Sequence, residues 1–435
     1  MKISKLALIL VLCLSFTALT FAATAEELAA NAVSNDKDLA TASITELREM
    51  GRVGLDALFT KYAAEIDRFK TTGEVDEQWL RISAALDNVS MQKDDYASQL
   101  FWYTDIEEAK RVADKQNKPI LSLRLLGNLN EEFSCANSRL FRALLYPNAE
   151  VSKYLRDNYI LHWRSIRPAP RVTIDFGDGR KIERTITGNS IHYILDEDGT
   201  IIDALPGLYS PRAFLKYLTD GREISKIAGN FPKNDRARAF MRYRQMNFDQ
   251  IKQKRDKAVG YAKVELKETP ADNSGLVLAA PSALSAAPIA TAKMVVTDEY
   301  SILRVYDDFA KFEPAVTFTD WDKLAKLYSP VLKIDDNSRA FIRRQNAKTG
   351  LTESEFNGLL AKLDSFVALD TTRNDFLYHT KIYEWLNANR GTEALETFND
   401  RVYTDIFKTP GSDKWLGLYS SDVYTALDGN GIINK

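Results

Sequence analysis

The sequence predicts a central α/β unit with a helical region on either side. Residues 99–222 alternate between amphipathic helical stretches and short apolar runs bounded by turn residues, a pattern typical of a mixed sheet with flanking helices. Residues 26–98 and 294–435 carry apolar residues at helical spacing. The chain has 435 residues, of which 45% are hydrophobic, and this favours two or three domains at roughly 100–200 residues each.

Residues 1–25 have the three-part pattern of a secretory signal peptide. Lys2 and Lys5 precede an uncharged apolar run over 6–21, and small residues follow at Ala23 and Ala25. The run is shorter than the roughly 20 apolar residues that span a bilayer, which favours cleavage over an uncleaved anchor. We therefore expect a cut after Ala25, a periplasmic or secreted protein, and no stable membrane insertion after the cut.

The composition argues against several classes of function. A net charge of -2 gives no general attraction to nucleic acid or to anionic membranes. We find no His/Cys/Asp cluster with metal-ligand spacing and no glycine-rich phosphate loop, so we expect no metal and no cofactor. Only Cys13 and Cys135 are cysteines, and Cys13 would leave with the signal peptide. The mature chain would then have a single thiol and no internal disulfide.

Residues 223–293 separate the central unit from the C-terminal helical region. Residues 223–266 predict a basic helical arm, with nine Lys or Arg residues between positions 233 and 257. Acidic residues dilute this charge, so a solvated helix face is favoured over a nucleic-acid site. Residues 267–293 are rich in Ala, Pro and Ser and predict a linker.

Capping boxes indicate two helix starts in the flanking regions, Ser43 with Glu46 and Thr352 with Glu355. Gly51 and Gly54 are expected to interrupt the apolar stripe where one helix ends and the next begins. The N-terminal region resembles a helical-hairpin repeat, but without a second clean copy we favour a small helical cap packed on the central unit. In the C-terminal region, residues 370–386 predict a long amphipathic helix. This helix contains His379, for which we find no partner at ligand spacing.

The central unit divides into predicted elements by its periodicity and its turn residues. We expect helices over 105–116, 136–145, 149–156 and 211–218, and strands over 120–126, 159–163, 191–195 and 200–204. A hairpin of residues 172–176 and 181–186 is expected around Gly177-Asp178-Gly179. His162 falls in an apolar strand, where a core position is expected.

A Cys-x-x-Ser sequence opens the predicted helix after the strand 120–126, which Lys118-Pro119 precedes. With the elements above, it resembles a thioredoxin-superfamily domain over about residues 100–220. The blocks Ser134–Arg139, Thr173–Gly179 and Gly188–Tyr193 are similar to exported bacterial proteins described as thioredoxin-like, whose activity is not established. The resemblance implies that the first two strands of the unit run parallel and the third antiparallel.

In such an arrangement, polar residues at the strand ends meet at one edge of the sheet, where binding sites of open α/β sheets tend to lie. Cys135 would lie at a helix N-terminus, where unpaired backbone N–H groups and nearby arginines favour the thiolate. The predicted catalytic residues at this edge are Cys135 and Ser138, and the predicted binding residues are Arg139, Arg164, Arg167, Asn189, Ser190 and His192.

The resemblance also implies two residues that this chain lacks. In the family, a second cysteine three residues after the first resolves the mixed disulfide, but Ser138 stands there. Working members carry a cis-proline just before the third strand, where this chain has Asn189-Ser190-Ile191. With Cys13 removed, a two-cysteine dithiol cycle is excluded by composition.

Three functional hypotheses follow. The favoured one is a degenerate thioredoxin-like fold that serves as a binding or interaction module, with Arg and Asn side chains holding an anionic ligand or a peptide. The second is monothiol exchange by Cys135 with a protein or small-thiol partner, an external thiol resolving the mixed disulfide. The third is a Cys-His hydrolase or transferase with His192 as base. The alternative for Cys135 itself is a buried small hydrophobic residue.

Overall fold

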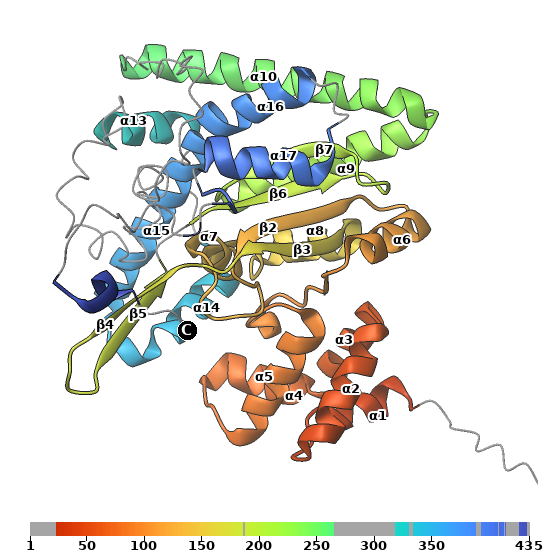
Figure 1. Ribbon diagram of the computed structural model, residues 1–435, viewed down its shortest axis with the longest axis vertical. Helices are drawn as coiled ribbons and strands as arrows, with labels where there is room; N and C mark the ends of the chain where they lie inside the picture. Colours follow the sequence, from red (N-terminus) through yellow and green to blue (C-terminus); the bar gives the residue numbers. More distant parts are fainter. Residues whose placement is uncertain are drawn as a thin grey trace, which may run out of the picture.

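A five-stranded mixed sheet lies among flanking helices in a protein that is otherwise mostly helical (Figure 1). The computed structural model describes residues 23–185, 188–264, 318–329, 334–388, 393–407, 409–412, 414 and 426–432. Most of the predicted signal peptide and the whole linker 267–293 lie outside these ranges and stay predictions. Within the described ranges, no helix combines the length and apolarity needed to cross a membrane.

The sheet has the strand order β1-β3-β2-β6-β7. Its strands are β1 (Trp102–Tyr103), β2 (Ile120–Leu126), β3 (Ile160–Arg167), β6 (Ser190–Leu195) and β7 (Ile201–Pro206). β3 runs parallel to both β1 and β2, whereas β6 is antiparallel to β2 and β7 is antiparallel to β6. The predicted directions of the strands at 120, 159 and 191 are therefore confirmed. The predicted hairpin forms a separate two-stranded sheet of β4 (Arg171–Asp175) and β5 (Lys181–Thr185).

Helices precede, flank and follow the sheet. The N-terminal helices are α1 (Ala25–Asn31), α2 (Lys37–Glu49), α3 (Arg52–Lys61), α4 (Ala63–Thr72) and α5 (Glu77–Ser90), followed by the 3₁₀ turn η1 (Asp95–Ala97). The central helices are α6 (Ile106–Gln116), α7 (Ala136–Leu140) with its π-helical continuation η2 (Phe141–Leu145), α8 (Ala149–Asn158), α9 (Pro211–Gly229) and α10 (Lys233–Ala262).

The C-terminal helices are α13 (Phe318–Tyr328), α14 (Asp336–Gln345), α15 (Glu353–Arg373), α16 (Thr380–Ala388) and α17 (Leu395–Arg401). The π-helical turn η5 (Asn374–His379) joins α15 to α16, and the π-helical turn η6 (Val402–Ile406) extends α17. The 3₁₀ turns η4 (Ala347–Thr349) and η7 (Asp428–Gly431) complete the described elements. The helix predicted over 370–386 is thus part of a longer helical run.

One of the two predicted capping boxes is present. Thr352 and Glu355 exchange hydrogen bonds at the start of α15, as expected. The Ser43 box is wrong, because Ser43 is buried in the middle of α2. Asp36 starts that helix earlier, since its carboxylate accepts the free backbone N–H groups of the first turn. Gly51 separates α2 from α3 with a φ of 65°, as predicted, whereas Gly54 lies inside α3 and does not interrupt a helix.

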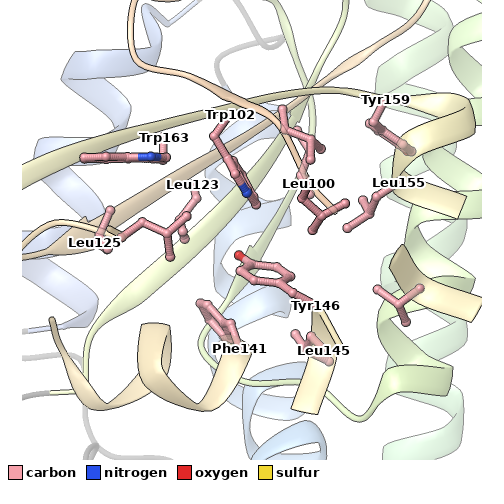
Figure 2. Close-up of a cluster of buried hydrophobic side chains, with 14 of the residues drawn as sticks. Leu100, Trp102, Leu123, Leu125, Phe141, Leu145, Tyr146, Leu155, Tyr159 and Trp163 are labelled. Atoms are coloured by element: carbon pink, nitrogen blue, oxygen red, sulfur yellow. The ribbon is translucent and has the colours of Figure 1, made fainter. Parts of the chain in front are cut away.

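The core is built on the alternation of side chains along the strands. Leu123 and Leu125 of β2 lie on the same side of the sheet as Phe141, the first residue of η2, and Tyr146, the residue after η2 (Figure 2). Each fully buried side chain of this size contributes about 1.5–3 kcal/mol relative to exposure. The same apolar cluster includes buried residues of the N-terminal helices, the sheet and the C-terminal helices. These parts of the chain therefore share one core.

Helix α10 confirms the predicted basic helix, but its charges are not all solvated. Arg244 is fully buried and donates to the backbone carbonyls of Ile201 and Ile202 in β7. Arg236 forms an ion pair with Glu197 in the turn before β7. The prediction of a solvated face is wrong for these two residues, because apolar neighbours such as Phe240 turn this side of the helix towards the sheet and α9.

Gly54 allows α2 and α3 to approach closely, and this predicts a strong effect of Gly54→Ala. An added Cβ would collide with the backbone carbonyl of Leu47 in α2. Because backbone cannot move aside as a flexible side chain does, we expect a loss of about 1–3 kcal/mol in the free energy of unfolding, measured by chemical denaturation. Gly229→Ala at the end of α9 is the matched control, because nothing lies within 4 Å of its added Cβ. Equal stability of the two variants would contradict this explanation.

Candidate functional site

Cys135 lies in a small polar environment that is closed to solvent. Its exposed fraction is 0%, and its Sγ is 2.9 Å from the Ser190 hydroxyl oxygen. The thiol also lies 3.6 Å from the Ser138 hydroxyl and 3.6 Å from the Asn189 backbone carbonyl. The structure therefore brings four predicted residues together: Cys135, Ser138, Asn189 and Ser190. Both the polar surroundings and the complete burial of the thiol constrain what it can do.

The local chain path explains how the thiol reaches this position. The Cys135 backbone N–H donates to the Leu126 carbonyl at 3.0 Å, which returns the loop to the end of β2. Cys135 is then the residue just before α7, as predicted. The Ser138 hydroxyl donates to the Cys135 carbonyl at 2.8 Å, so its proton serves the helix turn. Ser138 can accept a hydrogen bond from the thiol, but it cannot resolve a disulfide.

The segment after α16 covers this group of residues, and we call residues 395–407, 409–412 and 414 the C-terminal cover. The Asn189 amide nitrogen donates to the Phe407 carbonyl at 3.1 Å and to the Thr409 hydroxyl at 3.0 Å. The Tyr403 hydroxyl donates to the Asn189 carbonyl at 3.3 Å. Arg167 donates to the Pro410 carbonyl at 3.3 Å. The cover thus lies over the sheet edge at which the site is predicted.

The opposite face of the sheet holds the beginning of the cover. Arg124 of β2 is fully buried, and its guanidinium contacts the Glu396 carboxylate of α17 at 2.7 Å. Arg164 of β3 contacts the same carboxylate at 3.3 Å. Because Arg124 and Arg164 are paired across the two strands, they share a face from which Leu123 and Leu125 point away. The expectation that Arg164 lies beside the thiol is therefore wrong.

The side chains of two further predicted residues contact groups other than the thiol. Arg139 donates to the Thr185 hydroxyl at 2.8 Å and so connects α7 to β5. His192 is buried between the Phe141 and Phe214 rings, and its Nε2 is 2.8 Å from the Tyr146 hydroxyl. Burial lowers the pKa of His192 to about 3, which leaves the ring neutral. In the described structure Cys135 makes no hydrogen bond to His192, so the Cys-His hydrolase hypothesis lacks its geometry.

A second buried polar cluster surrounds His379, for which the sequence suggests no partner. Its Nε2 is 2.8 Å from an Asp203 carboxylate oxygen in β7, and its Nδ1 is 3.5 Å from the Asp375 carboxylate. Tyr243 donates to Asp203 at 2.8 Å, and Tyr217 donates to Asp375 at 2.9 Å. The two carboxylates outweigh the burial of the ring and raise the pKa of His379 to about 9. Both nitrogens of this imidazolium therefore donate, and neither can act as a base.

Some of these contacts have a signal in the sequence and others have none. Arg124 interrupts the apolar run of β2, and a charge in a buried strand requires a partner. His162 is buried as predicted, and its Nδ1 lies 2.8 Å from the Ser122 hydroxyl. Nothing near His379 in sequence indicates Asp203, which lies 176 residues earlier. In the described ranges, no group of three or more His, Cys, Asp or Glu side chains is placed to hold a metal ion.

Comparison of the chain with protein-family models, with curated proteins and with solved structures finds no match. The fold and the site therefore define the protein only as a mixed α/β protein with a buried thiol under a C-terminal cover.

The His379 cluster predicts a pH-dependent loss of stability on His379→Gln. A folded pKa of about 9 lies above the ~6.5 of an unfolded imidazole, so the cluster stabilises the fold fully below about pH 6.5. This contribution is lost as the pH rises through about 9. The variant should therefore lose more stability near pH 6 than near pH 9.5, measured by chemical denaturation against the wild type at each pH.

His162→Gln is the control for this measurement. Burial and the neighbouring arginines lower the pKa of His162 to about 3, so its ring stays neutral in the folded protein over the same range. Its effect on stability should change little between the two pH values. An equal loss at both values for His379→Gln would show that the ring is not charged in the fold.

Proposed function

We propose that the α/β unit is a thioredoxin-like binding module, and that the segment bound to it in this chain is the C-terminal cover. One observation carries this proposal. Of the predicted binding residues, Arg164, Arg167 and Asn189 all contact the cover, through the Glu396 carboxylate and through backbone carbonyls. These are the residue types expected to hold an anionic ligand or a peptide, and the cover presents both kinds of acceptor.

The thioredoxin-like part of the proposal rests on strand directions and on the position of the thiol. The parallel pair of β2 and β3, the antiparallel β6 and the placement of Cys135 after β2 are what the resemblance implies. Asn189 and Ser190 face the thiol from the start of β6. The two departures from the family pattern favour binding over redox turnover. Ser138 cannot do what the second cysteine of the family does, and Asn189 stands near the position where the family has its proline.

The contacts indicate what kind of ligand the module holds. Asn189 and Arg167 donate to main-chain carbonyls, which any polypeptide offers, and this gives affinity without strong sequence preference. Arg124 and Arg164 converge on one carboxylate, which selects an acidic residue at that position. The proposed ligand is therefore a helical turn with an acidic side chain, followed by a less regular stretch of chain.

The proposal predicts that Glu396→Gln loosens the cover and exposes Cys135. Glu396 is 46% exposed, so solvent screens the ion pairs and the effect is smaller than for a buried pair. A loss of about 1.4 kcal/mol in closing the cover would raise the rate of cysteine alkylation about tenfold, if the cover opens before the thiol reacts. The measurement is the rate of iodoacetamide labelling of a chain that begins at residue 23, where Cys135 is the only thiol.

Glu384→Gln is the matched control, because Glu384 is exposed on α16 and pairs only with Lys381 among the described residues. Its labelling rate should equal that of the wild type. If Glu396→Gln labels no faster than Glu384→Gln, the cover does not protect the thiol in the way proposed.

Monothiol exchange is the second candidate, favoured by the Ser190 hydroxyl at 2.9 Å from Sγ. A hydroxyl that donates to sulfur stabilises the thiolate, which is the nucleophile in exchange. The Cys135 thiolate would attack one sulfur of an external disulfide, form a mixed disulfide and release the other sulfur as a thiolate. A second external thiolate would then attack the mixed disulfide and restore Cys135, so that no net oxidation occurs.

This candidate predicts a reaction with an external disulfide once the cover is loosened. In Glu396→Gln, formation of a mixed disulfide between Cys135 and oxidised glutathione, followed by mass spectrometry, should be faster than in the wild type. Adding Ser190→Ala to this variant should slow the reaction, because the hydroxyl beside the sulfur is lost. An equal rate with and without Ser190→Ala would contradict monothiol chemistry and leave the binding module.

A further inference from the structure

A cavity next to the His379 cluster has the features of a binding site. Tyr217 and Asp375 belong to both. It has a volume of about 460 Å³ and lies between α9, α10, α13 and the end of α15 with η5. This volume is within the range of roughly 300–1,000 Å³ that small-molecule sites occupy. Helix α10 forms its outer wall along the edge of the molecule that is shown at the top of Figure 1.

Cationic side chains dominate the mouth of this cavity. Arg212 and Lys254 line it, and in the described structure neither has an ion-pair partner. Lys216, a third cation, pairs with Asp220 one turn along its own helix, at 2.6 Å. Cations that form no ion pair attract an anion, and among the described residues Arg212 and Lys254 pair with no carboxylate.

A buried amide points to a ligand by an independent route. Asn247 of α10 lines the cavity and is only 3% exposed, and its Nδ2 has no hydrogen-bond partner in the described residues. A buried donor without a partner carries a free-energy cost, because it has lost its hydrogen bonds to water. An anionic group bound beside Arg212 and Lys254 would accept from this nitrogen and remove that cost.

The floor of the cavity has different chemistry. Asp375 lies there, and its Oδ2 accepts one hydrogen bond, from Tyr328 at 2.8 Å. A carboxylate oxygen can accept a second hydrogen bond, so the floor favours a hydroxyl donor and disfavours a second negative charge. The anionic group of a ligand would therefore face the mouth, and its hydroxylated part would face Asp375.

The neighbouring cavity supports this assignment by contrast. It has a volume of about 780 Å³ and shares Ser210 and Arg212 with the first. Its other charged residues are acidic: Glu150, Asp335, Asp336 and Asp364. Burial raises the pKa of Asp364 to about 6, so at neutral pH it is mostly ionised, and together with the other carboxylates it repels anions from this side. The smaller cavity is thus the one of the two that suits an anion.

We propose that the cavity lined by Arg212, Asn247 and Lys254 binds a small hydroxylated anion, such as a sugar phosphate or a sugar acid. The cations and the amide hold the phosphate or carboxylate, and Asp375 accepts from a hydroxyl. This site is independent of Cys135 and of the C-terminal cover. An occupied site would also join α9 and α10 to α13 through one ligand.

Isothermal titration calorimetry at constant ionic strength tests the proposal with glucose 6-phosphate and gluconate as probes and glucose as the uncharged control. We expect one or both anions to bind and glucose to bind at least tenfold more weakly. Binding of glucose 6-phosphate alone would assign a phosphate ester, and binding of gluconate alone a carboxylate. Arg212→Gln and Lys254→Gln should each weaken binding about tenfold, since a hydrogen bond to a charged group contributes about 1.5–3 kcal/mol.

Lys252→Gln is the matched control, because Lys252 is exposed on the same helix but does not line the cavity. It should leave the affinity unchanged. Asn247→Asp should abolish binding of both anions, and circular dichroism shows whether the variant is folded. The proposal is overturned if neither anion binds, if glucose binds as tightly, or if Arg212→Gln and Lys254→Gln bind as well as Lys252→Gln.

Discussion

A buried arginine in the central strand determines where the C-terminal helices can pack. Arg124 is fully enclosed in β2, and a guanidinium removed from water costs several kcal/mol unless it is paired. The strand β2 has β3 and β6 on its two sides, so a carboxylate partner for Arg124 must come from the helices that pack on the face of the sheet to which Arg124 points. Glu396 of α17 supplies the carboxylate at 2.7 Å. Once α17 lies there, the turn that follows it has only a short distance to the sheet edge, and the cover closes over Cys135.

The His379 cluster fixes the same C-terminal region at a second place. His379 of η5 contacts Asp203 of β7, and Asp203 also accepts from Tyr243 of α10, so the cluster joins three elements that are far apart in the chain. Buried ionic groups of this kind are weak evidence for stability, but they tolerate only one arrangement of their partners. Apolar packing between helices could slide by a turn, whereas a shift of η5 against β7 would leave the Asp203 carboxylate buried without the ring.

Local patterns in the sequence predict much of the fold and only part of the site. The bounds of β2 are predicted to the residue, because Pro119 and Gly127 limit its apolar run on both sides. The two-residue β1 is not predicted, because it is too short to show the alternation of apolar and polar residues that is typical of a strand. Cys135, Ser138, Asn189 and Ser190 come together because strand direction alone brings their ends to one edge. Arg164 and His192 do not contact them. A position near the sheet edge does not determine on which face of the sheet a side chain lies or against which rings it packs. The contacts to the cover span more than 200 residues, so the sequence near Arg124 indicates that a partner is needed but does not indicate which residue it is.

Asn189, the residue just before β6, provides a second buried contact to the cover. In the family that the central unit resembles, a proline stands just before the third strand and faces the thiol. A proline has no side-chain donor, whereas Asn189 at this position donates to both the Phe407 carbonyl and the Thr409 hydroxyl in a buried environment. Solvent reaches the Glu396 side of the ion pairs, whereas the Asn189 amide is buried, so the cover is held at a second place that solvent does not screen. Asn189 therefore connects the thiol to the cover, because its backbone carbonyl lies 3.6 Å from the Cys135 sulfur while its side-chain amide donates to the cover.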